Sequence, residues 1–498
     1  WERFALCSKK FMKLFFKIIG VIFFTALKLN AQTPSLFTAS PSFNATNRIV
    51  SASFFTWYAS HYGQLSGPWR PLEGRTNWTG EPDFWKGQIK QVMMANIDVL
   101  YVHLIPSFTP QRINFFKALN TLRSEGYDVP KVAPFLDPLI SWGETPAIDA
   151  ANAKGKDAIA DQYVQFFNQY FSVNRDRFAD DYVARIDQRV VLDTWHVHLS
   201  ISNFSSLSRD DLEKRLAVAF GQHPVFSNGI CMVTTSLNGP SFPFADEKVP
   251  QFEINEYFKA TTYHGITSVQ LKAGYWDQNV RNNPGDFLKR DGGKPYAEAW
   301  KNVDRRKVQR VYVESWNEFD EGTGIFAAST AHPYIQPGSG NTNTDLWSKT
   351  GNPFEYIDTT ARGASAFNDV PDHDAKILWH NIPRKMLVGE KKVATVVVRN
   401  EGDVSWTSAA NFKFGQKEFK DAFLFGPGRY LLTDTTDEIP LYKGIFRGRP
   451  KIFQITLKAP QLPGIFLTHW GMLQESVEWF GEELSIPITV SSPLEGSN

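Results

Sequence analysis

Residues 311–325 read Val-Tyr-Val-Glu-Ser-Trp-Asn-Glu-Phe-Asp-Glu-Gly-Thr-Gly-Ile, and this stretch decides how the rest of the chain is interpreted. Its first half alternates β-branched and aromatic residues, which predicts a short buried strand. Its second half carries Glu318, Asp320 and Glu321 and then breaks at Gly322 and Gly324. A strand that ends in clustered acids and glycines places carboxylates at the rim of a sheet, where a ligand can reach them.

Glu318 and Glu321 are the predicted catalytic pair. Two carboxylates held close together repel each other, which separates their pKa values and leaves one as the acid and the other as the base. Cleavage of a glycosidic bond requires that division of roles. The spacing of the pair permits the short carboxyl separation of retaining enzymes without fixing it, so retention and inversion both stay open. The alternative is a solvated acidic turn after a core strand.

Strand patterns alternate with helical patterns through the first part of the chain. The predicted strands cover residues 49–58, 99–105, 131–136, 189–195, 229–235, 268–273 and 308–315, and the predicted helices cover 83–96, 110–124, 158–171, 209–220, 295–303 and 359–367. This alternation predicts parallel strands and an α/β fold, either a closed (β/α)8 barrel or an open doubly wound sheet. An open nucleotide-binding sheet would carry a glycine-rich turn after its first strand, whereas this chain carries Trp57-Tyr58 there.

Polar and aromatic residues recur at the C-terminal ends of the predicted strands, which is where barrel enzymes place their active sites. We therefore predict a (β/α)8 TIM barrel over residues 32–370. Substrate contacts are expected from Trp57, Tyr58, His61, Tyr62, Asp137, Asp193, Trp195, Trp276, Asp277, Trp316 and Asn317. Tryptophan rings stack on the apolar faces of sugars, although each of these rings could equally belong to the core. Asp137 and Asp193 are expected to accept sugar hydroxyls or to pair with arginines rather than to catalyse.

Composition and charge narrow the class of ligand. The chain has 53 basic and 52 acidic side chains, a balance that argues against a nucleic-acid-binding protein. Its 15 tryptophans among 498 residues fit a sugar-binding cleft. His61, His196 and His198 could suggest a metal, but they do not have zinc-type spacing, so we expect neither a metal nor a cofactor.

The N-terminal segment predicts export. Residues 1–31 are interpreted as an upstream remnant followed by a signal peptide that begins at Met12 and is cleaved after Ala31. Its apolar run, residues 14–27, is too short for a comfortable membrane span. We expect an exported monomer, periplasmic or extracellular, without a membrane span. Processing would leave Cys231, in an apolar run, as a small buried hydrophobe.

The pattern changes after Pro371. Alternating apolar residues cover 394–398, 452–457, 465–470 and 486–490, with glycine and proline between them at short intervals. This punctuation predicts a β-sandwich over residues 371–498.

Residues 315–323, Ser-Trp-Asn-Glu-Phe-Asp-Glu-Gly-Thr, resemble the signature Ser-Phe/Trp-Asn-Glu-Trp-x-Glu-Gly-Thr of the family 99 glycoside hydrolases, which are endo-α-mannosidases and endo-α-mannanases. Residues 353–358, Pro-Phe-Glu-Tyr-Ile-Asp, also resemble a segment C-terminal to the signature in relatives of that family. The resemblance implies that Glu318 acts as general base through the sugar 2-hydroxyl and that Glu321 acts as general acid. The chain departs from the signature at Phe319, where the family has Trp, and at Asp320, where it prefers His.

The C-terminal segment is similar to the Ig-like domain known from selective-autophagy receptors and also appended to bacterial glycosidases. The matching residues are Gly389-Glu390, Val-Val-Val-Arg-Asn-Glu-Gly at 396–402, Trp406, and Leu-Gln-Glu-Ser-Val-Glu-Trp-Phe-Gly at 473–481. This resemblance implies a domain that packs against the barrel and covers its edge, with independent glycan binding as the alternative.

Together these features predict a secreted glycoside hydrolase that cleaves an α-linked glycan or polysaccharide with the Glu318/Glu321 pair. The whole layout resembles secreted glycosidase-like proteins of Bacteroides-type bacteria. Two alternatives stay open: a noncatalytic glycan-binding barrel protein, which would bind sugar without releasing reducing ends, and a polysaccharide-biosynthesis protein of the WbsX type, which shares the acidic motif. The predicted signal peptide and the lack of a nucleotide-phosphate loop in the sequence count against the second.

Overall fold

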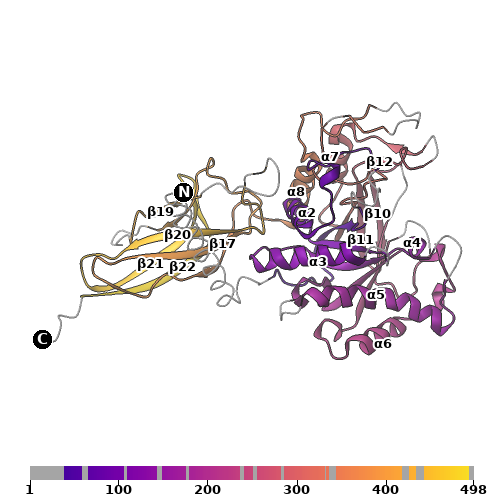
Figure 1. Cartoon of the computed structure of the whole chain (residues 1–498), viewed down its shortest axis with the longest axis horizontal. Coiled ribbons are helices and arrows are strands. Elements are labelled where there is room, and N and C mark those ends of the chain that lie inside the picture. The colour runs from indigo at the N-terminus through magenta and orange to yellow at the C-terminus, as the bar shows by residue number, and fades with distance from the viewer. Residues whose placement is uncertain are drawn as a thin grey trace, which may run out of the picture.

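The computed structural model has a first body of helices and strands and an elongated second body built from strands (Figure 1). It describes residues 39–58, 66–105, 109–142, 148–174, 179–235, 240–250, 255–281, 285–330, 332–335, 344–417, 425–432, 442 and 444–492. The predicted signal segment, residues 1–31, lies outside the described residues, and so do the predicted site residues His61 and Tyr62.

The first body is organised around eight parallel strands of the described chain, which are arranged in sequence order. They are β1 (Ile49–Phe54), β2 (Val99–Leu104), β3 (Lys131–Leu136), β6 (Arg189–Trp195), β8 (Ile230–Thr235), β9 (Glu247–Val249), β11 (Ile266–Lys272) and β14 (Arg310–Glu314). The last strand pairs with the first, so the sheet curls back on its own beginning. β9 lies beside β11 without a ladder of hydrogen bonds between them in the described residues. The predicted parallel α/β arrangement is confirmed, and the sheet forms a nearly closed barrel.

Helices connect many of the barrel strands. They are α2 (Pro82–Met94), α3 (Thr109–Ser124), α4 (Pro138–Trp142), α5 (Ala153–Val173), α6 (Arg209–Phe220), α7 (Lys294–Lys301) and α8 (Glu355–Asn368). The six predicted helices are confirmed, α6 with the predicted bounds and the other five with shifted ends. α6 begins at a capping box formed by Ser208 and Asp211. In the described chain every helix is too short or too polar to cross a membrane.

Shorter elements complete this body. The strands are β4 (Ile148–Asp149), β5 (Arg185–Ile186), β7 (Ile201–Ser202), β10 (Phe258–Tyr263), β12 (Tyr275–Trp276) and β13 (Phe287–Leu288), and the 3₁₀ helices are Arg75–Asn77, Ala179–Tyr182, Val197–Leu199, Phe204–Ser206, Pro224–Phe226 and Asp291–Gly293. β10 pairs antiparallel with β11, and β12 with β13. Cys231 on β8 is fully buried, as the sequence predicts.

The interior of the barrel is polar. The rings of Tyr101 on β2 and Tyr312 on β14 approach to 6.0 Å between centroids across β1, so both side chains point inward. Register places Asp193 of β6 and Gln270 of β11 on the same face. The Thr235 hydroxyl lies 2.9 and 3.0 Å from the two Asp193 oxygens, and burial raises the pKa of Asp193 to about 8. Such a core differs from the aliphatic layers typical of these barrels.

An ion pair spans the seam where the β9–β11 ladder is missing. Arg310 on β14 donates to Glu247 on β9 through Nε at 2.8 Å and Nη2 at 2.5 Å. The same guanidinium donates to the carbonyls of Ala45 at 3.1 Å and Asn47 at 2.6 Å. Both charged groups are almost completely buried. The bidentate pair therefore links β9 to the far side of the seam.

Removing one partner of this pair leaves the other charge buried. We expect Glu247→Gln to lower the free energy of unfolding by about 3–5 kcal/mol, and the double variant Glu247→Leu/Arg310→Met to lose less than the sum of its single changes. Urea denaturation of the full chain measures both. An unchanged midpoint in Glu247→Gln would show that the seam does not depend on the pair.

The second body consists of two sheets. One contains β15 (Ala375–His380), β17 (Lys391–Asn400) and β20 (Pro450–Lys458), and the other contains β16 (Lys385–Leu387), β22 (Glu478–Ser491), β21 (Gly464–Gln474), β18 (Phe412–Gln416) and β19 (Arg429–Leu431). Val396 and Ile455 of the first sheet share one buried cluster with Trp470 and Ile488 of the second. Burial alternates along β20, as expected for a strand with one face in a core. The resemblance to an Ig-like domain stays a prediction.

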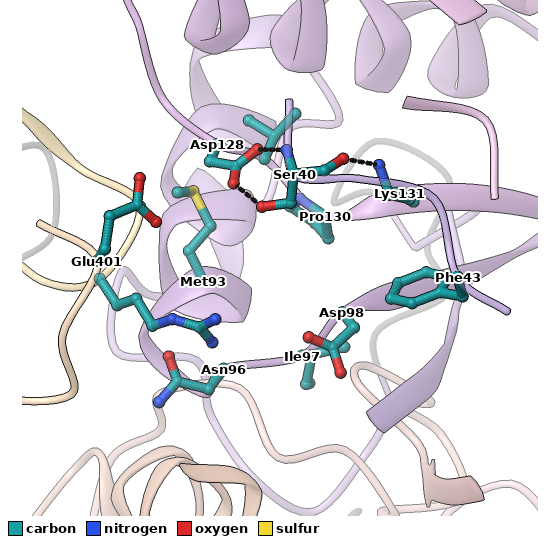
Figure 2. Close-up of a pocket in the computed structure, with 13 residues that line it drawn as sticks. Ser40, Phe43, Met93, Asn96, Ile97, Asp98, Asp128, Pro130, Lys131 and Glu401 are labelled. Carbon is teal, nitrogen blue, oxygen red and sulfur yellow. Dashed lines mark hydrogen bonds between the residues drawn. The ribbon is translucent and has the colours of Figure 1, made fainter. Parts of the chain in front are cut away.

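The second body contacts the barrel at the end where the strands begin. The Asp128 N–H, just before β3, donates to the Gly448 carbonyl at 2.9 Å, and Asn96, just before β2, donates to Asp403 at 2.9 Å. A cavity of about 190 Å³ lies at this junction (Figure 2).

Polar contacts from both sides of the junction line that cavity. Ser40 donates to the Asp128 carboxylate, and Lys131 donates to the Ser40 carbonyl at 2.8 Å (Figure 2). Burial lowers the pKa of Lys131 to about 8. The cavity therefore belongs to the junction, at the opposite end of the barrel from the acidic turn after β14.

Candidate active site

The turn that comes after β14 is held by buried polar side chains. The Ser315 hydroxyl accepts a hydrogen bond from the Glu318 N–H at 2.6 Å and lies 2.8 Å from the Thr323 hydroxyl. The Asn317 amide accepts from the Phe55 N–H at 2.8 Å and donates to the Phe55 carbonyl at 2.7 Å. These contacts tie the turn to the end of β1, so the acids stand on a fixed support.

Arg290 holds the same turn from the other side. Its side chain is fully buried and donates through Nη2 to the carbonyls of Gly322 at 2.7 Å and Gly324 at 2.6 Å. Its guanidinium carbon lies 4.5 Å from the centre of the Trp347 ring and 4.6 Å from that of Tyr356. A planar cation suits this arrangement, because it can donate in its plane and lie against rings with its faces.

Two glycines allow close approach of backbones in the site. Gly322 has a φ of 60°, and a Cβ there would lie 2.9 Å from the Pro68 side chain. At Gly67, in the segment after β1, a Cβ would lie 1.9 Å from the Phe319 carbonyl oxygen. Only glycine fits both positions without moving the backbone of the turn.

Glu318 sits among acids and a phenol. It is partly buried, and the Tyr58 hydroxyl donates to its Oε1. Burial raises the pKa of Glu318 well above its usual value, and the charges of Glu321 and Asp320 raise it further, while the hydrogen bond from Tyr58 opposes the shift. This environment favours a protonated Glu318.

Glu321 sits beside cations. Its side chain is 27% exposed, and Arg281 donates to its Oε1. Burial raises the pKa of Glu321, but the charges of Arg281 and Lys272 oppose that shift. The charge of Glu321 also raises the pKa of Glu318, so the two carboxyls influence each other although their surroundings differ.

Asp320 is held by the segment C-terminal to β1. Its Oδ1 accepts a hydrogen bond from the Ser66 N–H at 2.9 Å. Burial raises the pKa of Asp320 to about 6, against the effect of backbone N–H donors from Ser66 and Gly67. Asp320 therefore adds negative potential near Glu318 while its own oxygen is bound to backbone.

Three predicted substrate-binding residues, Trp57, Tyr58 and Asp137, are connected through His103 in a series of contacts that leads to Glu318. Trp57 lies 5.5 Å from Tyr58 and 4.6 Å from His103 between ring centres. His103 Nε2 lies 3.3 Å from Asp137 Oδ2. Trp57 is partly buried, and Trp195, at the C-terminal end of β6, is partly buried as well. These two tryptophans keep the exposure that stacking on a sugar requires.

Five further described residues that were predicted to bind substrate are fully buried, and their contact with substrate stays a prediction: Asp193, Trp276, Asp277, Trp316 and Asn317. The Trp316 indole donates to Gln88 at 3.1 Å, and Asn317 is bound to Phe55. Asp277 accepts from the Tyr275 hydroxyl at 2.9 Å. Asp193, Asp277, Trp316 and Asn317 have polar atoms bound to protein, as side chains that support a site do. The buried indole N–H of Trp276 has no hydrogen-bond partner among the described residues.

Sequence reasoning missed the two arginines that shape the site. Arg281 lies four positions after Asp277, and its Nε lies 3.0 Å from that carboxylate, so an acid–base spacing was available as a signal. Arg290 gave no signal, because nothing in its local pattern points to a turn more than thirty residues later. Within the described ranges, no group of three or more His, Cys, Asp or Glu side chains is arranged to hold a metal ion.

Comparisons with known proteins give distant structural similarities. No protein-family model matches the chain, and no curated protein matches it. The GH99 endo-α-mannosidase from Bacteroides thetaiotaomicron is similar at 14% identity, with 64% of this chain and 97% of that chain covered and a TM-score of 0.47. In complex with BIS-TRIS-propane, the corresponding values are 15%, 64%, 97% and 0.45. A putative β-galactosidase from Bacteroides fragilis is similar at 9% identity, with 91% of this chain and 58% of that chain covered and a TM-score of 0.32. Similarities this distant do not show a function for this chain. Its function depends on its own side chains.

The support from Arg290 can be tested without a substrate. Arg290→Lys removes the planar fork, and we expect it to lower the free energy of unfolding by about 1–3 kcal/mol because buried carbonyls lose their donor. Hydrogen exchange should become faster in residues 315–325. The control is Arg306→Lys, a change at an exposed arginine paired with Asp304. Equal exchange in both variants would contradict this role for Arg290.

Proposed function

We propose that this chain is a secreted glycoside hydrolase that cleaves an α-linked glycan or polysaccharide with Glu318 and Glu321. The observation that carries the proposal is the unlike surroundings of two neighbouring carboxyls, one beside the Tyr58 hydroxyl and one beside the Arg281 guanidinium. In the usual two-carboxylate glycosidases, one carboxyl protonates the leaving oxygen and an ionised carboxylate acts on the other side of the reacting carbon.

The position of the pair supports this function. The acidic turn comes directly after the C-terminal end of β14, and strand C-terminal ends are the usual site of chemistry in barrel enzymes. Trp57 and Tyr58 come after β1 next to it, where an aromatic face could receive a pyranose. The turn is braced by Ser315, Asn317 and Arg290, which meets the requirement that catalytic groups keep their geometry.

The finer parts of the proposal rest on sequence. The α-linkage rests on the resemblance of residues 315–323 to the family 99 glycoside hydrolases. Export to the periplasm or the outside of the cell rests on the signal-peptide pattern of residues 1–31. We further propose that the protein acts as a monomer and that residues 371–498 form an Ig-like domain attached to the barrel.

The test is a panel of α-linked glycans and polysaccharides, assayed for release of reducing ends. We expect Glu318→Gln and Glu321→Gln each to lower turnover by roughly 10²–10⁴-fold, because each removes one proton-transfer group. Glu298→Gln, a change at an exposed glutamate on α7, is the matched control and should retain full activity.

Circular dichroism and thermal unfolding establish that the variants are folded. Full activity in both single variants would refute the assignment. Sugar binding without release of reducing ends in the unmodified chain would favour the noncatalytic glycan-binding barrel. Transfer of sugar from a nucleotide donor would favour the polysaccharide-biosynthesis alternative.

A further inference from the structure

Trp479 lies on the outer face of the sheet that contains β22, β21 and β18. Its neighbour along β22, Phe480, belongs to the buried cluster between the two sheets of the second body, and side chains alternate between faces along a strand. The indole of Trp479 therefore points away from that cluster, and it is only partly buried. Leu473, its partner on β21, is almost fully buried on the same outer face.

Two glycines let the indole lie against the sheet. A Cβ at Gly415 on β18 would lie 3.1 Å from Cη2 of Trp479, and a Cβ at Gly471 on β21 would lie 3.8 Å from its Cε3. The two glycines are paired across neighbouring strands, so the six-membered ring of the indole covers both. A side chain at either position would stand between the ring and the sheet. The sheet therefore supports one face of the indole and leaves the other directed outward.

Charged side chains border the indole toward both ends of these strands. Toward one end, Glu475 accepts a hydrogen bond from Lys413 Nζ at 2.9 Å and lies 3.5 Å from Arg429 Nε. Toward the other end, Glu483 accepts a hydrogen bond from Lys417. Donors and acceptors are thus available on two sides of one partly exposed aromatic ring.

Two of these cations also contact the ring. Arg429 Cζ lies 5.0 Å and Lys417 Nζ lies 5.5 Å from the ring centre. Each is held by a further group, because Arg429 donates to the Gln416 carbonyl at 3.0 Å and Lys417 donates to the Glu483 carboxylate. These contacts fix the orientation of the indole while part of its surface stays exposed.

The composition of this surface favours an uncharged, hydroxylated ligand. A polyanion would meet a carboxylate beside each cation, which weakens the attraction that such ligands need. An apolar partner would have to bury the ions around the ring, which is costly. A pyranose has an apolar face that can lie on the indole and hydroxyls at its edge that can bond to charged side chains. The surface therefore matches a neutral sugar.

We propose that this surface, the Trp479 patch, is a binding site for a neutral glycan, with the indole against one sugar ring and the charged side chains bonded to its hydroxyls. The patch consists of Trp479, Lys413, Lys417, Arg429, Glu475 and Glu483. It belongs to the second body, whereas the acidic turn comes after β14 of the barrel. The site adds attachment to a glycan to the proposed hydrolysis and does not depend on it.

Affinity electrophoresis of the full chain tests this site. The chain migrates through native gels that contain α-mannan, amylopectin or xylan, and its retardation at several polysaccharide concentrations gives a dissociation constant. A Glu318→Gln background prevents cleavage of the polymer. We expect at least one of these polysaccharides to retard the chain. Trp479→Ala should raise the dissociation constant by at least about tenfold, because the stacking surface is lost.

Two further variants make the result specific to the patch. Lys417→Gln keeps the indole and removes one charged donor, so we expect a dissociation constant about 3–10-fold higher. This variant decides the test if circular dichroism shows that Trp479→Ala does not fold. Leu467→Ser changes a residue of β21 that is 56% exposed on the same face, and it should leave the dissociation constant unchanged.

Four results would overturn the proposal. Equal retardation with and without the Trp479→Ala change would assign the binding to another surface, and no retardation by any of the three polysaccharides would exclude a neutral glycan. Retardation by heparin alone would show an ionic surface. A dimer in sedimentation that Trp479→Ala dissociates would show that the patch binds a second copy.

The outcome is separate from that of the proposed function. Retardation that is lost in Trp479→Ala supports the glycan site even if the chain releases no reducing ends from any substrate. Release of reducing ends that depends on Glu318 and Glu321 supports the hydrolase even if the patch binds nothing.

Discussion

The arrangement of the candidate site depends on a donor for the buried carbonyls of the turn after β14. The carbonyls of Gly322 and Gly324 are turned inward, and the buried guanidinium of Arg290 supplies the donor for both. A buried carbonyl without a donor is costly, so the turn, the segment before α7 and the aromatic residues Trp347 and Tyr356 must keep one arrangement. Because Glu321 precedes Gly322 directly, its place in the site is set by that arrangement.

Much of the barrel can be predicted because its strands and helices have strong periodic patterns. Strands such as β3 and β6 appear at the predicted positions, and the N-cap of α6 is found at Ser208. The missed strand, β9, has three residues, two of them charged. Its Glu247 is stabilised by Arg310 from another strand, and a contact of that range leaves no local signal. β16 and β19 were missed as well, because strands of three residues are too short to show a periodic pattern.

The acids of the site could be predicted, but their surroundings could not. The sequence shows carboxylates clustered before glycines. Only the fold shows which of these carboxylates has a cation beside it. Trp276 and Trp316 were predicted to contact substrate because they flank strand ends, with the core as an equal alternative, and both are buried. Tryptophan serves cores and sugar platforms equally well, and only packing decides between them. Arg281 shows the opposite case, since its spacing from Asp277 was visible but its reach to Glu321 was not.

The junction of the two bodies has a practical consequence. The second body is attached through Asn96 and Asp128, which lie at the end of the barrel where the strands begin. Glu318 and Glu321 lie at the other end, where the strands finish. A force or tether applied to the second body therefore acts at the end of the barrel opposite to the acidic turn after β14. If the protein were immobilised on a support through the second body, the end of the barrel that carries Glu318 and Glu321 would face the surrounding medium.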